Sequence, residues 1–237
     1  MLKEIPAIEF PELKINSGTL YIVSTPIGNL EDISFRALFT LKNVDCIAAE
    51  DTRTSGNLLS SYGIKNRLIS YYSHVESSKM DSIINELKSG KSIALISDAG
   101  TPCISDPGNM LVNRCVEENI EVISIPGASS LIHSLVLSGF STDKFYYQGF
   151  LPLKKGRETL FNELKDIKMP VIIFESPFRV LRTLQDIQKY MGNKEVVLGR
   201  ELTKKFEEIK RGKVKEILDN KNSLKIKGEF VIVINNS

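Results

Sequence analysis

The feature that most constrains the fold is a regular alternation of short apolar runs with amphipathic stretches, from Leu20 to Leu137. The amphipathic stretches repeat their apolar residues with the 3.6-residue period of a helix. Strands that alternate with helices pair in parallel through right-handed crossovers. The pattern therefore predicts a doubly wound α/β domain with a mostly parallel sheet. The expected strands and helices alternate in this order: 20–24, 33–41, 44–49, 52–62, 68–72, 77–88, 93–97, 109–118, 122–125 and 129–137.

The pattern changes near Gly139, where aromatic residues crowd into positions 140–150. Beyond this point, strand-like runs are no longer separated by regular helices, which favours a mixed, partly antiparallel sheet. The expected strands are 171–174, 195–198, 206–210 and 230–234, and the expected helices are 158–165 and 179–190. We therefore predict an N-terminal extension at 1–18, an N-terminal α/β domain at 19–139 and a C-terminal α/β domain at 140–237.

Composition excludes several classes of protein. The chain has 31 Lys or Arg against 29 Asp or Glu, and no apolar run approaches the roughly 20 residues that cross a bilayer. Three cysteines without a C-x-x-C spacing and two histidines give no pattern of a zinc site. We expect a cytosolic globular protein without a metal centre or a membrane segment. Basic residues exceed acidic ones between Arg200 and Lys227, which is consistent with a solvated surface or with one that faces RNA.

Ligands of open parallel sheets bind beyond the carboxyl ends of the strands, so the loops after strands are the places to look. The loop at 24–32, STPIGNLED, lacks the G-x-G-x-x-G that cradles a pyrophosphate, so NAD and FAD are poorly supported. The loop at 97–108, SDAGTPCISDPG, should turn tightly and expose its backbone, with Asp106 and Pro107 starting the next helix. The loop at 125–130, IPGASS, suits an adenine beside a helix start, or is simply a capped turn.

Charged residues at strand ends are the candidates for catalysis. In the segment AEDTR, Arg53 is able to hold a phosphate bidentately, while the alternative is a helix capped by Asp51 with Arg53 paired to Glu50. The segment FLPLKKGR at 150–157 joins apolar residues to three cations, which suits a phosphate-binding lid or a solvated linker. The segment FESPFR at 174–179 again puts an acid and an arginine after a strand.

Taken together, these loops resemble the tetrapyrrole methylase family, and within it the branch that methylates small-subunit ribosomal RNA. The matching segments follow one another from Leu20 to Ile234, and several are long and contiguous. They are LYIVSTPIGNLEDIS, IAAEDTR, LISDAGTPCISDPG, IPGASS, YYQGFLPLKKGR, FESPFR, GRELTK and GEFVIVI.

The resemblance implies two α/β domains with S-adenosylmethionine in the cleft between them, and a homodimer. It implies methyl transfer to the ribose 2′-hydroxyl of a cytidine in the decoding region of 16S rRNA, within the 30S subunit. Cofactor contacts are then expected at Asp98, Gly100, Thr101, Ala128, Ser129, Leu151 and Gly228.

Methyl transfer to a ribose hydroxyl requires alignment of the reactants and help in removing a proton from a weak nucleophile. On that basis the candidate catalytic residues are Glu50, Asp51, Arg53 and Glu175. The candidate RNA contacts are Arg53, Lys154, Lys155, Arg157 and Arg179.

One position departs from the family, because Phe178 stands where many relatives have histidine and cannot act there as an acid or base. Three alternatives stay open. The first is a methyltransferase that acts on a corrin or sirohaem precursor, and the second is a non-catalytic RNA-binding module. The third is a phosphohydrolase that uses Asp98, Asp106 and Glu50 with Mg²⁺, for which a phosphate-cradling loop is missing. Because the sequence ends soon after the last expected strand, we expect RNA contacts to come from the two core domains.

Overall fold

The protein is described by a computed structural model that covers residues 13–72 and 76–236. Its contacts divide the chain into two compact units. The first unit ends at Gly127, and the second unit comprises Ala128 onward together with Pro26–Glu31. Of the predicted N-terminal extension, residues 1–12 lie outside the described residues. None of the helices in the described ranges is long and apolar enough to span a bilayer.

The first unit is a five-stranded sheet in the order β3-β2-β4-β1-β5, in which every neighbouring pair is parallel. This confirms the doubly wound domain that the alternation predicts. The strands are β1 (Leu20–Val23), β2 (Cys46–Ala49), β3 (Leu68–Ser70), β4 (Ile93–Ile96) and β5 (Val122–Ile125), and the helices are α1 (Phe35–Asn43), α2 (Thr52–Ser61), α3 (Glu76–Lys88) and α4 (Asn109–Glu117).

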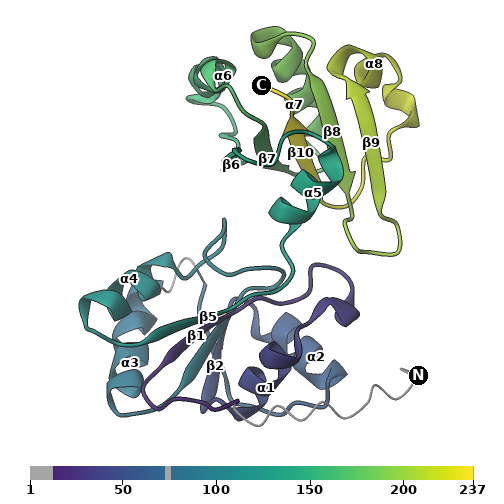
Figure 1. Ribbon diagram of the computed structural model, residues 1–237. Coiled ribbons are helices and arrows are strands. Elements are labelled where there is room, and N and C mark those ends of the chain that lie inside the picture. The colour runs from purple at the N-terminus through teal and green to yellow at the C-terminus, as the bar shows by residue number, and fades with distance from the viewer. Residues whose placement is uncertain (1–12, 73–75, 237) are drawn as a thin grey trace. The chain divides into compact units, whose positions relative to one another are not determined.

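Both faces of this sheet are covered by helices (Figure 1). Because successive side chains of a strand point to opposite faces, Leu20 and Ile22 of β1 pack in the cluster that contains residues of α3 and α4. Tyr21 and Val23 pack in the cluster that contains residues of α1 and α2. Strands buried on both faces need continuous apolar runs, which explains why these strands show no polar alternation in the sequence.

The second unit is a five-stranded mixed sheet in the order β6-β7-β10-β8-β9. Only β6 and β7 are parallel, and the other pairs are antiparallel, as the irregular second half predicts. The strands are β6 (Tyr146–Phe150), β7 (Val171–Glu175), β8 (Glu195–Arg200), β9 (Glu208–Lys213) and β10 (Phe230–Ile234). The helices are α5 (Ser130–Ser138), α6 (Arg157–Asp166), α7 (Val180–Asp186) with a π-helical turn at Ile187–Met191, and α8 (Val214–Asp219), and short 3₁₀ turns lie at Leu30–Asp32 and Lys221–Ser223.

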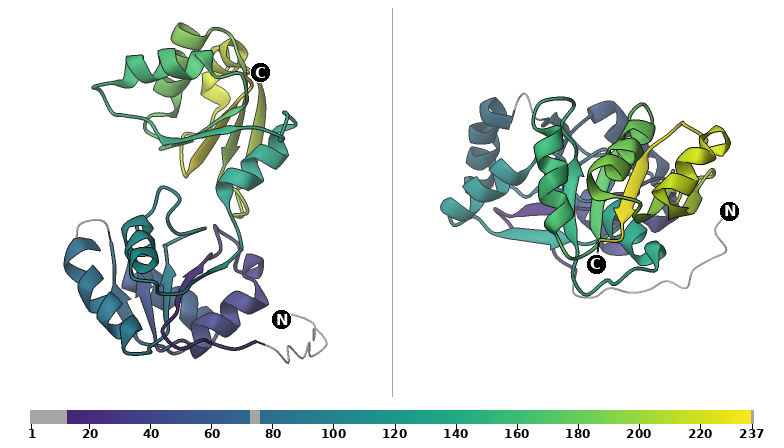
Figure 2. Two further views of the ribbon diagram at one scale, coloured as in Figure 1. Left: turned by 60° about the vertical axis from the view of Figure 1, so that its left-hand side comes forward. Right: turned by 90° about the horizontal axis from the view of Figure 1, so that it is seen from above.

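Helix α5 lies on the opposite face of the second sheet from α6 and α7 (Figure 2). Leu131 and Leu135 of α5 share a core cluster with Val231 and Val233 of β10. The division by contacts therefore falls before α5, whereas the pattern of elements sets the domain limit after it, at Gly139. Composition changes at Gly139, but composition does not reveal which sheet a helix packs against.

The loop after β1 belongs to the second unit. Ile27 is buried in the same cluster as Leu202, and Gly28 lies against the chain at 202–204. A Cβ atom at Gly28 would lie 2.2 Å from Cγ of Lys204, so a larger residue would force this loop to shift. The single glycine of the loop therefore serves close packing rather than a pyrophosphate cradle.

Candidate active site

Three loops meet at the carboxyl edge of the first sheet, after the neighbouring strands β4, β1 and β5. The backbones of Thr25 and Gly100 exchange two hydrogen bonds of 2.9 and 3.1 Å. The hydroxyls of Ser24 and Thr101 lie 2.9 Å apart. A Cβ atom at Gly127 would lie 2.9 Å from Cβ of Ser24, so the loop after β5 packs tightly on the loop after β1. Small side chains thus bring three backbones together.

The loop at 97–108 is tightly coiled, as its glycines and prolines predict. Four of its residues have positive φ, namely Gly100 (85°), Cys103 (72°), Ser105 (64°) and Gly108 (131°). Left-handed backbone at a residue other than glycine costs about 1–3 kcal/mol and tends to persist at functional sites. The backbone of this loop therefore has a specific, strained conformation, as loops of functional sites often have.

The start of α4 differs from the expectation that Asp106 is its N-cap and Pro107 its first residue. The N-cap is Gly108, and the helix begins at Asn109. A Cβ atom at Gly108 would lie 2.5 Å from Cδ2 of Leu95, so the chain passes too close to β4 for a side chain at this position. Asp106 therefore does not cap α4.

Two carboxylates that follow β2 and β4 are joined through backbone groups. The N–H of Asp51 donates to Oδ1 of Asp98 at 3.1 Å, and the N–H of Asp98 donates to Oε2 of Glu50 at 3.4 Å. Burial, together with the neighbouring negative charges, raises the pKa of Glu50 and of Asp98 above their usual values. The structure thus brings the predicted catalytic Glu50 beside the predicted cofactor residue Asp98.

Asp51 and Arg53 form a local pair. Asp51 is the N-cap of α2 and accepts the N–H of Arg53 at 2.8 Å. Nη2 of Arg53 lies 2.7 Å from Oδ2 of Asp51, while the arginine side chain remains 88% exposed. Hydrogen bonds from Arg53 lower the pKa of Asp51 to about 2. Capping by Asp51 is confirmed, but Arg53 pairs with Asp51 and not with Glu50.

From the sequence, Asp106 had a site role only in the phosphohydrolase alternative and not in methyl transfer, although it lies in the same group of acids. Burial raises the pKa of Asp106 to about 6, the charges of Glu50 and Asp98 contribute to the rise, and a hydrogen bond from Ser97 opposes it. A carboxylate with a pKa this near neutrality is a candidate for proton transfer.

In the second unit, the predicted catalytic Glu175 is buried in a polar network. Its side chain is 0% exposed. Oε1 accepts from Nη2 of Arg179 at 2.7 Å and from the N–H of Ser176 at 2.8 Å, while Oε2 accepts from the hydroxyl of Thr183 at 2.6 Å. Both carboxylate oxygens therefore already have protein partners.

Arg157 belongs to the same network and is buried, with a side chain 5% exposed. Its Nε donates to Asp186 at 2.7 Å, its Nη2 donates to the hydroxyl of Thr183 at 2.7 Å, and its Nη1 donates to the carbonyl of Pro152 at 3.1 Å. All three of its nitrogens therefore hold protein groups rather than a phosphate. Its neighbours in the sequence, Lys154 and Lys155, are exposed.

The expected cofactor residues of the second unit lie in different settings. Ser129 is the N-cap of α5 but makes no capping hydrogen bond with its side chain, and Ala128 precedes it. The carbonyl of Leu151 accepts a hydrogen bond from Arg179. At Gly228 a Cβ atom would lie within 2.5 Å of the side chain of Glu201, so packing by itself requires glycine there.

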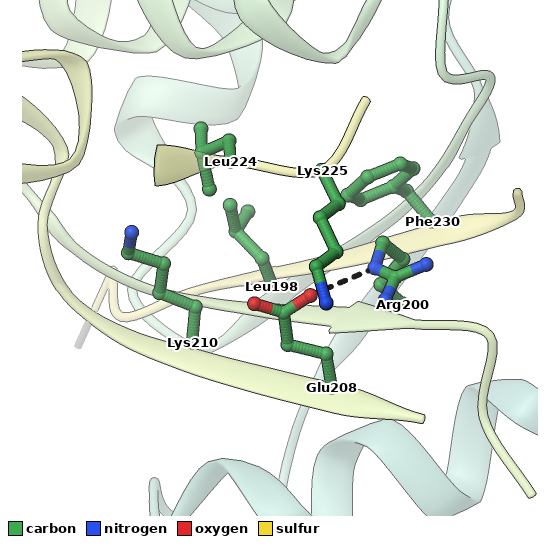
Figure 3. A pocket seen from close by; sticks show the side chains of 7 residues that line it. All are labelled: Leu198, Arg200, Glu208, Lys210, Leu224, Lys225 and Phe230. Atoms are coloured by element: carbon green, nitrogen blue, oxygen red, sulfur yellow. Dashed lines mark hydrogen bonds and ion pairs between the residues drawn. The ribbon is translucent and has the colours of Figure 1, made fainter. Parts of the chain in front are cut away.

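A pocket of the second unit lies between β8, β9 and the segment before β10 (Figure 3). Arg200, Lys210 and Lys225 line it together with Glu208. Arg200 donates to Glu208 and to the carbonyls of Phe206 and Lys227, so its charge supports the hairpin. The pocket contains none of the predicted site residues. Among the described residues, no group of His, Cys, Asp and Glu is arranged to hold a metal ion.

A comparison with family models matches residues 19–218 to the tetrapyrrole (corrin/porphyrin) methylases. This chain belongs to the tetrapyrrole methylase family. A protein from Thermotoga maritima, named ribosomal RNA small subunit methyltransferase I, is 46% identical over 92% of this chain and 98% of its own length. The protein of the same name from Halalkalibacterium halodurans is 46% identical over 92% of this chain and 76% of its own length.

Solved structures of lower sequence identity share the fold. A diphthine synthase has a TM-score of 0.72 at 13% identity and covers 91% of this chain and 89% of its own. A cobalt precorrin-4 methyltransferase has a TM-score of 0.67 at 16% identity, and the coverage is 92% and 94%. A uroporphyrin-III C-methyltransferase from Thermus thermophilus, solved with S-adenosylhomocysteine, has a TM-score of 0.63 at 14% identity and covers 91% and 96%. These likenesses confirm the α/β fold of the methylases.

Sequence reasoning missed the network residues Thr183 and Asp186, which lie on α7. Both are ordinary helix residues in the sequence, and neither lies within a family motif. Their partner Arg157 lies on a different helix, so only the packed structure reveals the contact. For Asp106 the available signal was its place in a loop that contains a second aspartate.

Proposed function

We propose that this chain transfers the methyl group of S-adenosylmethionine to the ribose 2′-hydroxyl of a cytidine in the decoding region of 16S ribosomal RNA. The observation that carries the proposal is the 46% identity, over 92% of the chain, to proteins named as ribosomal RNA small subunit methyltransferases. The choice of cytidine and of the 2′-oxygen rests on the resemblance of the motifs. On the same ground we propose a cytosolic homodimer that acts on the 30S subunit.

The residues at the carboxyl edge of the first sheet fit S-adenosylmethionine. Gly127 approaches Ser24 closely, and the loop at 97–108 is coiled, so this edge of the sheet is formed mainly by backbone groups and small side chains. Such a surface allows a flat ring and a ribose to approach the backbone closely. A structure of the same fold contains S-adenosylhomocysteine. When bound, the cofactor supplies an electrophilic methyl group. The residues proposed to hold it are Asp98, Gly100 and Thr101 of the first unit and Ala128, Ser129, Leu151 and Gly228 of the second.

We assign proton removal from the ribose hydroxyl to Glu50, with Asp98 as its neighbour. The raised pKa of Glu50 makes it a stronger base than an ordinary surface carboxylate once it is ionised. Asp51 suits this role poorly, because its pairing with Arg53 stabilises the charged carboxylate and lowers its pKa to about 2. A carboxylate with so low a pKa is a weak base. Asp51 instead caps α2 and orients Arg53, whose exposed guanidinium is available to an RNA phosphate.

We assign Glu175 a positioning role, since it is buried and fully hydrogen-bonded. The RNA contacts proposed from the remaining cations are Arg53, Lys154 and Lys155, which are exposed. Arg157 is left out because its nitrogens are engaged inside the protein, and Arg179 orders the loop at Leu151 through a hydrogen bond to its carbonyl.

The proposal is tested by incubating the purified protein with methyl-labelled S-adenosylmethionine and one of three acceptors: unmodified 30S subunits, free 16S rRNA or a corrin precursor. Labelled RNA is digested to nucleosides. Recovery of 2′-O-methylcytidine is the expected result. Label on the corrin alone would identify the chain as a methyltransferase that acts on tetrapyrroles. Binding of cofactor and RNA without methyl transfer would identify it as a non-catalytic binding module.

A further inference from the structure

Two loops of the second unit leave the same edge of its sheet. Strands β6 and β7 are parallel neighbours, so the segments that follow them, 151–156 and 176–179, begin side by side. A hydrogen bond of 2.9 Å from Nη1 of Arg179 to the carbonyl of Leu151 joins the two segments directly. We call the pair of segments the β6–β7 platform.

The buried network of Arg157, Thr183 and Glu175 holds both segments of the platform. Arg157 donates to the carbonyl of Pro152 in the first segment, and Glu175 accepts the N–H of Ser176 in the second. The hydroxyl of Thr183 connects Arg157 to Glu175. Charged groups that are buried and hydrogen-bonded on several sides hold a backbone firmly, since moving any one of them leaves a buried charge without a partner.

The two segments of the platform carry exposed side chains, an aromatic ring on one and cations on the other. Phe178 is 94% exposed. It stands in a turn in which the N–H of Arg179 donates to the carbonyl of Ser176 at 3.0 Å. Lys154 and Lys155 of the neighbouring segment are exposed, and neither forms an ion pair within residues 13–72 and 76–236. Such a ring on a well-held turn suits binding better than folding, because it contributes almost no buried area to the core.

We propose that Phe178 stacks on an unpaired nucleobase of the RNA substrate while Lys154 and Lys155 contact the adjoining phosphates. The inference rests on the proposed function and adds to it how the second unit holds the RNA. Aromatic rings stack on bases of any sequence, and neighbouring lysines neutralise the backbone, which is the usual combination in proteins that bind single strands. An RNA strand complements the positive charge of the two lysines, whereas a second copy of the same platform would bring like charges together.

The chain contains no tryptophan, so Phe178→Trp places a single fluorescent reporter on the platform. We expect a short unpaired cytidine-rich RNA to quench this reporter and to bind the variant as tightly as it binds the wild type. The control is Phe206→Trp, since Phe206 is also an exposed phenylalanine of the second unit, with 63% exposure, and Nζ of Lys205 lies 5.7 Å from its ring centre. Little quenching is expected at that site.

Phe178→Ala should weaken RNA binding about 5- to 150-fold, the range expected for loss of one stacked base. It should raise KM for 30S subunits in similar proportion, with little change in kcat, in the affinity for S-adenosylmethionine or in the melting temperature. Phe206→Ala should leave all these quantities unchanged. Phe178→Trp keeps an aromatic ring at this position and should therefore preserve the wild-type KM. Loss of binding in Phe178→Ala together with normal binding in Phe178→Trp would show that the aromatic ring itself contacts the RNA.

Three outcomes would overturn the inference: unchanged RNA affinity of Phe178→Ala, equal quenching of both reporters, or a change of oligomeric state in Phe178→Ala, which would make a second copy the occupant. Failure of the proposed function gives a different result. In that case the wild type transfers no methyl group to ribosomal RNA, while the binding and fluorescence experiments still report whether a base stacks on Phe178.

Discussion

The hydroxyl of Thr183 lies 2.6 Å from Oε2 of Glu175 and donates a hydrogen bond to it. The same hydroxyl oxygen accepts a hydrogen bond of 2.7 Å from Nη2 of Arg157. One neutral group therefore bridges a buried acid and a buried base that belong to different elements, β7 and α6. It uses both its donor and its acceptor capacity to do so.

Thr183→Val should destabilise the second unit by about 2–4 kcal/mol. Valine matches the shape of threonine but leaves Glu175 and Arg157 each short of one partner, and unsatisfied buried charged groups are costly. Urea unfolding measures the change. Thr159→Val, at an exposed position of α6, should have an effect close to zero, and equal effects of the two substitutions would contradict the bridging role.

Glu50→Gln should lower kcat for methyl transfer by about 10²- to 10⁴-fold, the usual contribution of a general base. In the wild type, the rate should fall as the pH drops through the raised pKa of Glu50, and the variant should lack this part of the pH profile. The matched control is Asp51→Asn, because asparagine caps helices about as well as aspartate and the change should leave most of kcat intact. Single-turnover rates on 30S subunits as a function of pH test both expectations.

Asp106→Asn should stabilise the first unit by about 1–2 kcal/mol at pH 8, after allowance for partial exposure to solvent. Since the pKa of Asp106 is about 6 in the folded protein and near 3.8 in the unfolded chain, the wild type loses stability as the pH rises between these values. The advantage of the variant should therefore shrink toward pH 4. Thermal unfolding of both proteins at pH 4.5 and pH 8 provides the comparison, and an advantage independent of pH would contradict the assignment.

Gly28→Ala should destabilise the second unit by about 1–3 kcal/mol, because the added methyl group would meet Lys204 at 2.2 Å and the carbonyl of Leu202 at 3.2 Å. Gly56→Ala is the opposite case. Gly56 lies inside α2, and a Cβ atom there has its nearest contact at 3.8 Å, so alanine should add about 1 kcal/mol through helix propensity. Denaturant titrations of the two variants should move in opposite directions.

Replacement of Lys154 and Lys155 by alanine should reduce the salt dependence of RNA binding. Each contact with a phosphate of a single strand contributes about 0.7 to the slope of log K against log salt, so the double variant should lose about 1.4. Lys165 and Lys168, which are also exposed in the second unit, provide the control pair. An unchanged slope for the Lys154 and Lys155 variant would exclude these lysines from the RNA interface.

Much of the first unit could be predicted from the sequence, because its signals are local. The apolar strand runs, the helical period and the Gly/Pro loops each lie within one short stretch of chain, and the capping of α2 by Asp51 depends on neighbouring residues only. In the second unit, β6 was missed because a register irregularity between Tyr147 and Gly149 disturbs its alternation, and α8 was missed because it is too short to show a period.

The sequence by itself determined the order of elements in the first unit, the parallel and mixed character of the two sheets, and the loops that carry the candidate site. Only the tertiary structure decided that α5 packs on β10, that Asp106 is desolvated beside Glu50 and Asp98, and that Arg157 is buried. The physical reason is that a period is a property of neighbouring residues, whereas burial, pairing of charges and desolvation arise between segments that folding brings together.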